Sequence, residues 1–209
     1  MFKKLLIIGF LLMFYGCQSN KKINECCRFH DDGRSKPMVT IVPIIDSTFY
    51  DIPWSLSEEL SSLINKNISD KGNIFTPKEK ENIKLSTNHN PFENNINWSK
   101  KMFKNAEFVV FIELTEHNDL PISKTIKNPN KISESRKLAS NLNISARLKI
   151  IDLRKKKPVI VLQEKIKDSF FMSNTIDKFD YNEVTWGTKT YKKSPMGEAH
   201  LQFAKELAD

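Results

Sequence analysis

Glycine is scarce in this sequence, with only six glycines among 209 residues. Loops that cradle phosphate groups through backbone N–H groups depend on closely spaced glycines, and the sequence contains no G-x-x-x-x-G-K-[ST] pattern. It also lacks the G-x-S-x-G pattern of serine hydrolases and the H-E-x-x-H pattern of zinc proteases. We therefore expect neither an enzyme nor a bound cofactor.

The sequence also lacks an apolar run long enough to cross a membrane as a helix. The apolar run at residues 5–16 would span about 18 Å, whereas the hydrocarbon core is roughly 30 Å thick. Lys3 and Lys4 precede the run, and Gly16 ends it. A basic start, a short apolar core and a small residue at the end are typical of an export signal. We predict a signal peptide over residues 1–16.

The residues around Cys17 resemble the lipobox of bacterial lipoproteins, whose usual pattern is Leu, a small residue, Gly or Ala, and then Cys. Gly16 and Cys17 match this pattern, whereas Phe14 and Tyr15 depart from it at the two outer positions. The resemblance implies cleavage before Cys17 and acylation of its thiol, with palmitate among the acyl chains, so that lipid anchors the chain to a membrane. Ordinary signal cleavage and an uncleaved anchor remain the alternatives.

The residue after Cys17 bears on which membrane holds the chain. In the lipoprotein family, Asp at this position retains the protein in the inner membrane, and this sequence has Gln18 there. For a host with two membranes, the resemblance therefore implies the outer membrane, with the folded domain in the periplasm.

Cysteine is rare as well, and the two cysteines besides Cys17 are adjacent, Cys26 and Cys27. With His30 they would supply three ligands, whereas a structural zinc site has four in a tetrahedron. Neighbouring cysteines are poorly placed to bridge each other. We expect no metal site and no role for this pair beyond the tether, although an exported compartment permits a disulfide to another chain.

Positive charge exceeds negative charge, and the formal net charge is +8 at pH 7. The Lys and Arg residues are scattered, and their densest run, residues 154–157, stands directly before Pro158. We interpret this run as the solvated tip of a hairpin, with contact to anionic lipid or a sugar polymer as the alternative. Because export is predicted, we expect no nucleic acid partner.

The pattern changes at Met38. Residues 18–37 are rich in Lys, Asn, Asp and Ser without apolar periodicity, which is typical of a flexible segment. Apolar blocks recur from Met38 onward. We predict a lipidated tether over residues 17–37 and one globular domain over residues 38–209.

Apolar blocks rich in β-branched residues predict the strands. Pro43 indicates that the first strand lies at an edge or is broken. The second is apolar at nearly every position, which predicts a central strand. The third alternates apolar and polar side chains, which predicts one solvent-facing side, and it forms a hairpin with the fourth. These strands are expected at residues 38–45, 106–114, 142–150 and 159–166, with a very short one at 74–75 and a long polar insertion at 116–141.

Capping patterns and apolar stripes predict the helices. Ser55 and Glu58 form a capping box before an apolar stripe that Gly72 can end. The segment Thr76–Pro77 predicts a second helix start, and Ser194–Pro195 predicts a C-terminal helix. Together these elements predict a single α/β domain, in which a mixed sheet of about five strands is packed with helices, including the C-terminal one.

Three sequence blocks follow this element order: V-T-I-V-P-I-I-D, A-E-F-V-V-F-I-E-L and I-S-A-R-L-K-I-I-D-L-R. Over residues 38–166 and the last helix, the chain resembles the domain shared by lipoproteins of the CsgG, LpoB and TolB N-terminal type. It also resembles small lipoproteins of chlamydia-like bacteria, which are rich in Asn, Lys and Ile. The resemblance implies an anchored α/β domain that binds another protein. We do not expect a pore, because residues 116–141 lack the alternating pattern of membrane hairpins.

One group of polar residues is a candidate for chemistry. Glu113, Glu116 and His117 follow the central strand, and Asp46 follows the first strand. Sheets of α/β proteins often place sites at such strand ends. We interpret the four as a surface cluster, with a catalytic dyad or a metal site as the alternative, and we interpret His200 in the last helix as structural. No catalytic residue is predicted.

The sequence thus predicts a lipid-anchored cell-envelope protein that acts without catalysis, through contact with another envelope protein in assembly or secretion. The insertion at residues 116–141 is the predicted contact surface, with a disordered segment without a binding role as the alternative. A homo-oligomer remains open. The alternative functions are regulation of peptidoglycan synthesis, surface adhesion and hydrolysis of envelope material.

Overall fold

The computed structural model describes residues 28–77, 89–122, 139–172 and 179–209. Among these, residues 28–36 and residues 37–209 belong to two separate units. In the first unit, Phe29 forms an antiparallel bridge with Ser35, and the chain between them turns. The second unit contains every helix and named strand of the described residues. The predicted signal peptide, Cys17, Cys26 and Cys27 lie outside the described residues.

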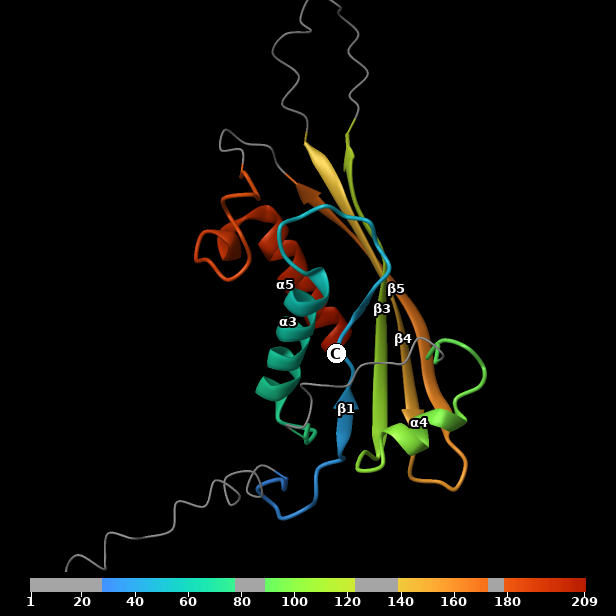
Figure 1. The fold of residues 1–209 in the computed structure, drawn as a ribbon. Coiled ribbons are helices and arrows are strands. Elements are labelled where there is room, and N and C mark those ends of the chain that lie inside the picture. Colours follow the sequence, from blue (N-terminus) through green and yellow to red (C-terminus); the bar gives the residue numbers. More distant parts are fainter. Residues whose placement is uncertain (1–27, 78–88, 123–138, 173–178) are drawn as a thin grey trace, which may run out of the picture. The chain divides into compact units, whose positions relative to one another are not determined.

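A mixed sheet of five strands forms the centre of the second unit, as predicted (Figure 1). Strand β3 is central: it pairs in parallel with β1 and β2 on one side and antiparallel with β4 on the other. Strand β4 pairs antiparallel with β5, which forms the second edge of the sheet within the described residues. The strands are β1 (Val39–Ile41), β2 (Ile45–Asp46), β3 (Phe108–Pro121), β4 (Ser140–Asp152) and β5 (Val159–Met172).

Pro43 separates β1 from β2, and both lie at one edge of the sheet, so the predictions of an edge and of a break are both confirmed. Proline has no backbone N–H and cannot donate to the ladder. Pairing with β3 resumes at Ile45, which lies opposite Glu113. The short strand predicted at residues 74–75 is present as a single bridge between Phe75 and Met38.

Three helices of the described residues pack on the sheet: α3 (Leu56–Lys71), α4 (Asn97–Met102) and α5 (Pro195–Ala208). Helices α3 and α5 lie side by side on one face, and α4 lies on the other (Figure 1). Helix α3 begins at its predicted cap, where Ser55 accepts from the backbone N–H of Glu58, and ends at Gly72 in the left-handed region. None of these helices is long and apolar enough to cross a bilayer. The helix start predicted at Thr76–Pro77 leads into residues 78–88, outside the described residues.

The insertion predicted at residues 116–141 begins later and ends earlier than expected. Strand β3 continues to Pro121 and β4 starts at Ser140, so the ends of the predicted insertion are paired strand. The polar residues of this stretch lie opposite β4, with His117 facing Ile144 in the ladder. Strand β5 is also longer than predicted and runs to Met172. Residues 123–138 lie outside the described residues.

The polar side of β4 is less exposed than its alternation predicted. Ser145 and Lys149 are completely buried. The chain around α4 covers this side, and the Lys149 ammonium donates to the backbone oxygen of Glu93 at 3.1 Å. Beside it, the Arg147 guanidinium lies 4.2 Å from the ring centroid of Phe92. The prediction of one solvent-facing side is therefore wrong at these positions, because α4 and its flanking residues were not expected from the sequence.

Gly197, in the first turn of α5, lies directly against the preceding chain. A Cβ there would overlap the backbone carbonyl oxygen of Tyr191. Although alanine is the better helix former by about 1 kcal/mol, we expect Gly197→Ala to lower the free energy of unfolding by about 1–3 kcal/mol. Urea denaturation measures this change, and Glu198→Ala at the exposed next position should change stability by less than about 0.5 kcal/mol. Equal stability of the Gly197 variant and the native chain would contradict the close approach.

Candidate functional site

A β-bulge divides the polar cluster that the sequence predicted. The register of β3 against β4 shifts between Leu114 and Glu116, so Thr115 is an extra residue in the strand. Glu113 and Glu116 therefore point to the face that α4 covers, whereas His117 points with Leu114 toward α3 and α5. The structure does not bring these three side chains into one site.

The three carboxylates of the predicted cluster are each held by local partners. Asp46 accepts from the backbone N–H and the hydroxyl of Thr48, at 2.9 and 2.7 Å. Glu113 accepts from the Ser47 hydroxyl at 2.6 Å and forms an ion pair with Arg147.

Glu116 accepts from the Ser145 hydroxyl at 2.9 Å, and this hydrogen bond lowers the pKa of its carboxyl. Lys167 on β5 forms an ion pair with it at 3.3 Å. The carboxylate thus joins all three antiparallel strands on the face that carries Ser145. Each of the three carboxylates is thus held by its own partners among the described residues.

His117 instead belongs to a buried polar network between the sheet and the two long helices. Its Nε2 lies 2.8 Å from Nε2 of His200 on α5, and Nδ1 of His200 lies 2.9 Å from an oxygen of Glu59 on α3. Tyr191 and Trp54 donate to the same carboxylate, each at 2.7 Å. The side chains of Glu59 and His200 are completely buried, and His117 is 1% exposed.

The hydrogen bonds of this network favour one arrangement of protons on the two imidazoles, in which Nδ1 of His200, 2.9 Å from the Tyr191 hydroxyl as well, donates to Glu59. Because Trp54 and Tyr191 both donate to Glu59, its oxygens act as acceptors, and His200 donates to them from Nδ1. Nε2 of His200 is then an acceptor, and Nε2 of His117 donates to it. The other ring nitrogen of His117, Nδ1, has no hydrogen-bond partner among the described residues.

Burial keeps the imidazole of His117, the member of the network on β3, uncharged. Desolvation, reinforced by the neighbouring His200, lowers the pKa of His117 to about 3. The Tyr50 ring covers the His117 imidazole, with 4.1 Å between ring centroids. Burial next to Glu59 raises the pKa of Tyr191, so its hydroxyl keeps its proton. The two imidazoles are sealed from solvent, which favours a structural role for the network.

Glu59 and Tyr191 were not singled out in the sequence, although one signal was present. Glu59 lies three residues after Leu56 and next to Leu60, on the apolar stripe of α3. A carboxylate on such a stripe needs a buried partner. Tyr191, in the short 3-10 helix η3 (Tyr191–Lys193), offers no comparable signal.

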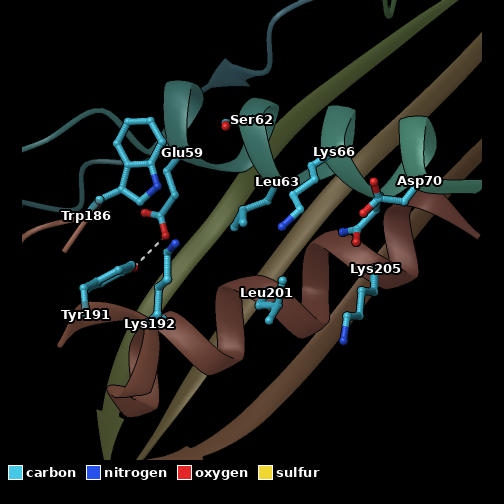
Figure 2. Close-up of a pocket in the computed structure, with 13 residues that line it drawn as sticks. Glu59, Ser62, Leu63, Lys66, Asp70, Trp186, Tyr191, Lys192, Leu201 and Lys205 are labelled. Carbon is cyan, nitrogen blue, oxygen red and sulfur yellow. Dashed lines mark hydrogen bonds between the residues drawn. The ribbon is translucent and has the colours of Figure 1, made fainter. Parts of the chain in front are cut away.

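A groove of about 510 Å³ lies between α3 and α5 and opens beside the Glu59 end of the network (Figure 2). Glu59, Tyr191 and Trp186 lie at one end of it, and Asp70 lies at the other. Leu63 and Leu201 contribute apolar surface to its middle from the two helices. Its lining includes three lysines, Lys66, Lys192 and Lys205.

In the ranges that the structure describes, no three His, Cys, Asp or Glu side chains are grouped so that they could hold a metal ion. The two imidazoles of the network bond each other through the nitrogens that would otherwise face a shared ligand. What the groove offers is lysine ammonium groups, an indole and a half-buried amide, which are suited to binding a ligand.

Residues 25–209 match the model of a family described as "Family of unknown function (DUF7499)", and the chain belongs to this family. A comparison with curated proteins found no match. The solved structures that match the chain include the following three bacterial proteins.

The hypothetical protein CT253 from Chlamydia trachomatis has a TM-score of 0.62 at 22% identity, over 83% of this chain and 94% of that one. PelC from Paraburkholderia phytofirmans, solved as a dodecamer, has a TM-score of 0.42 at 10% identity, over 83% and 86%. Lipoprotein GNA1162 from Neisseria meningitidis has a TM-score of 0.32 at 11% identity, over 64% and 83%. The likeness to CT253 concerns the fold alone, and the resemblance to the CsgG, LpoB and TolB N-terminal type stays a prediction.

Proposed function

We propose that this member of the DUF7499 family is a lipid-anchored protein of the bacterial cell envelope that binds another envelope protein and catalyses no reaction. The lipobox-like residues Gly16 and Cys17 support the anchor, and Gln18 supports the outer membrane. The element order that resembles the CsgG, LpoB and TolB N-terminal type supports a role in envelope assembly or secretion.

The observation on which the binding role rests is the contrast between a sealed polar network and an open groove. His117, on which the hydrolase alternative depends, is buried and bonded to His200, which is also buried. The groove between α3 and α5 is lined by exposed lysines that make no ion pair with any described residue. Charged groups that are free at a surface groove are available to a partner.

Replacing the predicted lipidation site should release the protein from the membrane. We expect the native chain to incorporate labelled palmitate, to fractionate with the outer membrane and to crosslink in cells to specific envelope proteins, which mass spectrometry identifies. Cys17→Ser should lose all three properties, because the acyl chains supply the membrane binding. Crosslinking between copies of the chain would at the same time report a homo-oligomer.

Cys27→Ser is the matched control, since it removes a thiol from the same predicted tether and should behave like the native chain. Palmitate incorporation by Cys17→Ser, or a folded native chain that captures no envelope protein, would contradict the proposal. A hydrolytic activity that is lost on changing His117 would favour the enzyme alternative instead.

A further inference from the structure

The groove between α3 and α5 carries an excess of uncompensated positive charge. Lys66, Lys192 and Lys205 line it, and none of them has an ion pair with a described residue. Asp70 is the one exposed carboxylate among the described lining residues, and the Glu59 carboxylate is occupied by Trp54, Tyr191 and His200. Ammonium groups on facing elements repel each other unless an anion lies between them. The groove is therefore electrostatically suited to a negatively charged ligand.

One half-buried side chain of the groove lining, Asn67, has a hydrogen-bond donor without an acceptor in the described part of the chain. The side-chain nitrogen of Asn67 is buried at the groove lining and has no partner among the described residues. A buried amide donor without an acceptor costs free energy, which a ligand oxygen would recover. Ser62 adds a hydroxyl to the same helix face. A ligand that fits these groups brings several acceptor oxygens.

The donors are spread along the groove and do not converge on one point. In Figure 2, Lys192 lies at the end with Glu59 and Tyr191, Lys66 extends into the space between the helices, and Lys205 lies at the end with Asp70. From Glu59 to Asp70, α3 rises about 16 Å at roughly 1.5 Å per residue. An extended peptide covers this length with about five residues at roughly 3.3 Å each. None of the described lining residues is Arg, the residue that pairs bidentately with phosphate.

We propose that the groove between α3 and α5 binds an extended acidic peptide segment of about five residues, supplied by the protein partner. The inference rests on the proposed function, because it assigns the binding role to this groove. Side-chain carboxylates of the segment pair with the lysines, and its backbone carbonyl groups accept from the Asn67 amide. Trp186 and the two leucines of the groove contact its apolar atoms.

Fluorescence anisotropy of labelled pentaglutamate, titrated with the full chain in detergent, tests this site. The native chain should bind pentaglutamate and should not bind pentalysine. The combined variant Lys66→Gln, Lys192→Gln and Lys205→Gln should bind at least about tenfold more weakly, since each exposed ion pair contributes a few-fold in affinity. Added salt should weaken binding to the native chain.

The matched control is the combined variant Lys155→Gln, Lys156→Gln and Lys157→Gln, which removes the same charge from the exposed turn between β4 and β5. Its affinity should stay within about twofold of the native value. An equal loss in both variants, or no loss in the groove variant, would overturn the proposal. If the groove variant fails to keep its circular dichroism spectrum, Asp70→Asn replaces it and should tighten binding, because it removes the one exposed carboxylate among the described lining residues.

Two further outcomes are distinguished. Vesicles of phosphatidylglycerol, but not of phosphatidylcholine, that displace pentaglutamate through the same lysines would overturn the peptide in favour of a lipid surface. If crosslinking captures an envelope protein but pentaglutamate does not bind, the groove assignment fails and the proposed function stands. If pentaglutamate binds and crosslinking captures nothing, the groove binds acidic peptides but the proposed function fails.

Discussion

Lowering the pH from 7.5 to 5 should remove about 2 kcal/mol of folding free energy through His117 alone. In the folded chain its pKa is about 3, because the imidazole is buried against His200, whereas its ordinary value is 6.5. Between these two values the unfolded chain binds a proton at His117 that the folded chain does not. The contribution is therefore complete above about pH 6.5 and falls as the pH drops toward 3.

Urea denaturation of the native chain and of His117→Gln between pH 7.5 and 5 measures this effect. Glutamine keeps an N–H donor for His200 but does not titrate, so the variant should lose about 2 kcal/mol less than the native chain. The contribution of Asp152, whose pKa is lowered by Arg154, to folding stability is lost mainly below this pH range. This contribution is the same in the native chain and in the variant. His30→Gln, outside the second unit, is the control and should keep the native slope. A His117→Gln profile parallel to the native one would refute the assignment.

Glu59→Ala should lower the free energy of unfolding by about 3–5 kcal/mol, a larger loss than we expect for Gly197→Ala. The carboxylate is completely buried and is the acceptor for Trp54, Tyr191 and His200. Removing it takes this acceptor from Tyr191 and His200, which are buried, and from Trp54, which is half-buried, and it leaves a cavity in the first turn of α3. A loss of this size is a large fraction of the roughly 5–15 kcal/mol typical of a domain.

The matched control is the neighbouring carboxylate, Glu58, which is exposed in the first turn of α3. Glu58→Ala should change stability by less than about 0.5 kcal/mol in the same urea titration. Glu59→Gln should fall between the two, since its amide oxygen still accepts while its amide nitrogen faces another donor. If Glu59→Ala does not fold, Glu59→Gln provides the measurement. A Glu59→Ala loss below about 1 kcal/mol would refute the role assigned to this carboxylate.

The sequence was informative wherever a local rule decides the structure. Ser55, Gly72 and Ser194 define helix ends through hydrogen bonds and backbone angles that involve only a few residues, and the structure confirms them. The second half of β3 was not recognised, because Thr115 to Asp119 have no apolar alternation. These residues are strand because β4 pairs with them, and such pairing depends on contacts distant in the sequence.

The candidate site was harder to predict than the fold. A β-bulge inserts one residue and reverses the alternation beyond it, so the face that His117 occupies could not be deduced from counting along the strand. Glu59 and His200 were both visible as polar residues on apolar stripes, but their meeting joins positions 141 residues apart. Only the packing of α3 against α5 brings them together.

That separation has a consequence for how the chain folds. If α3 docked on the sheet alone, the Glu59 carboxylate would be buried without its donors on η3 and α5. Burying it in this way costs free energy, which the apolar contacts of α3 alone would have to offset. Docking of the two helices is therefore coupled, and partly folded states with one helix in place are disfavoured. The buried network thus makes the docking of α3 and α5 on this face of the sheet cooperative.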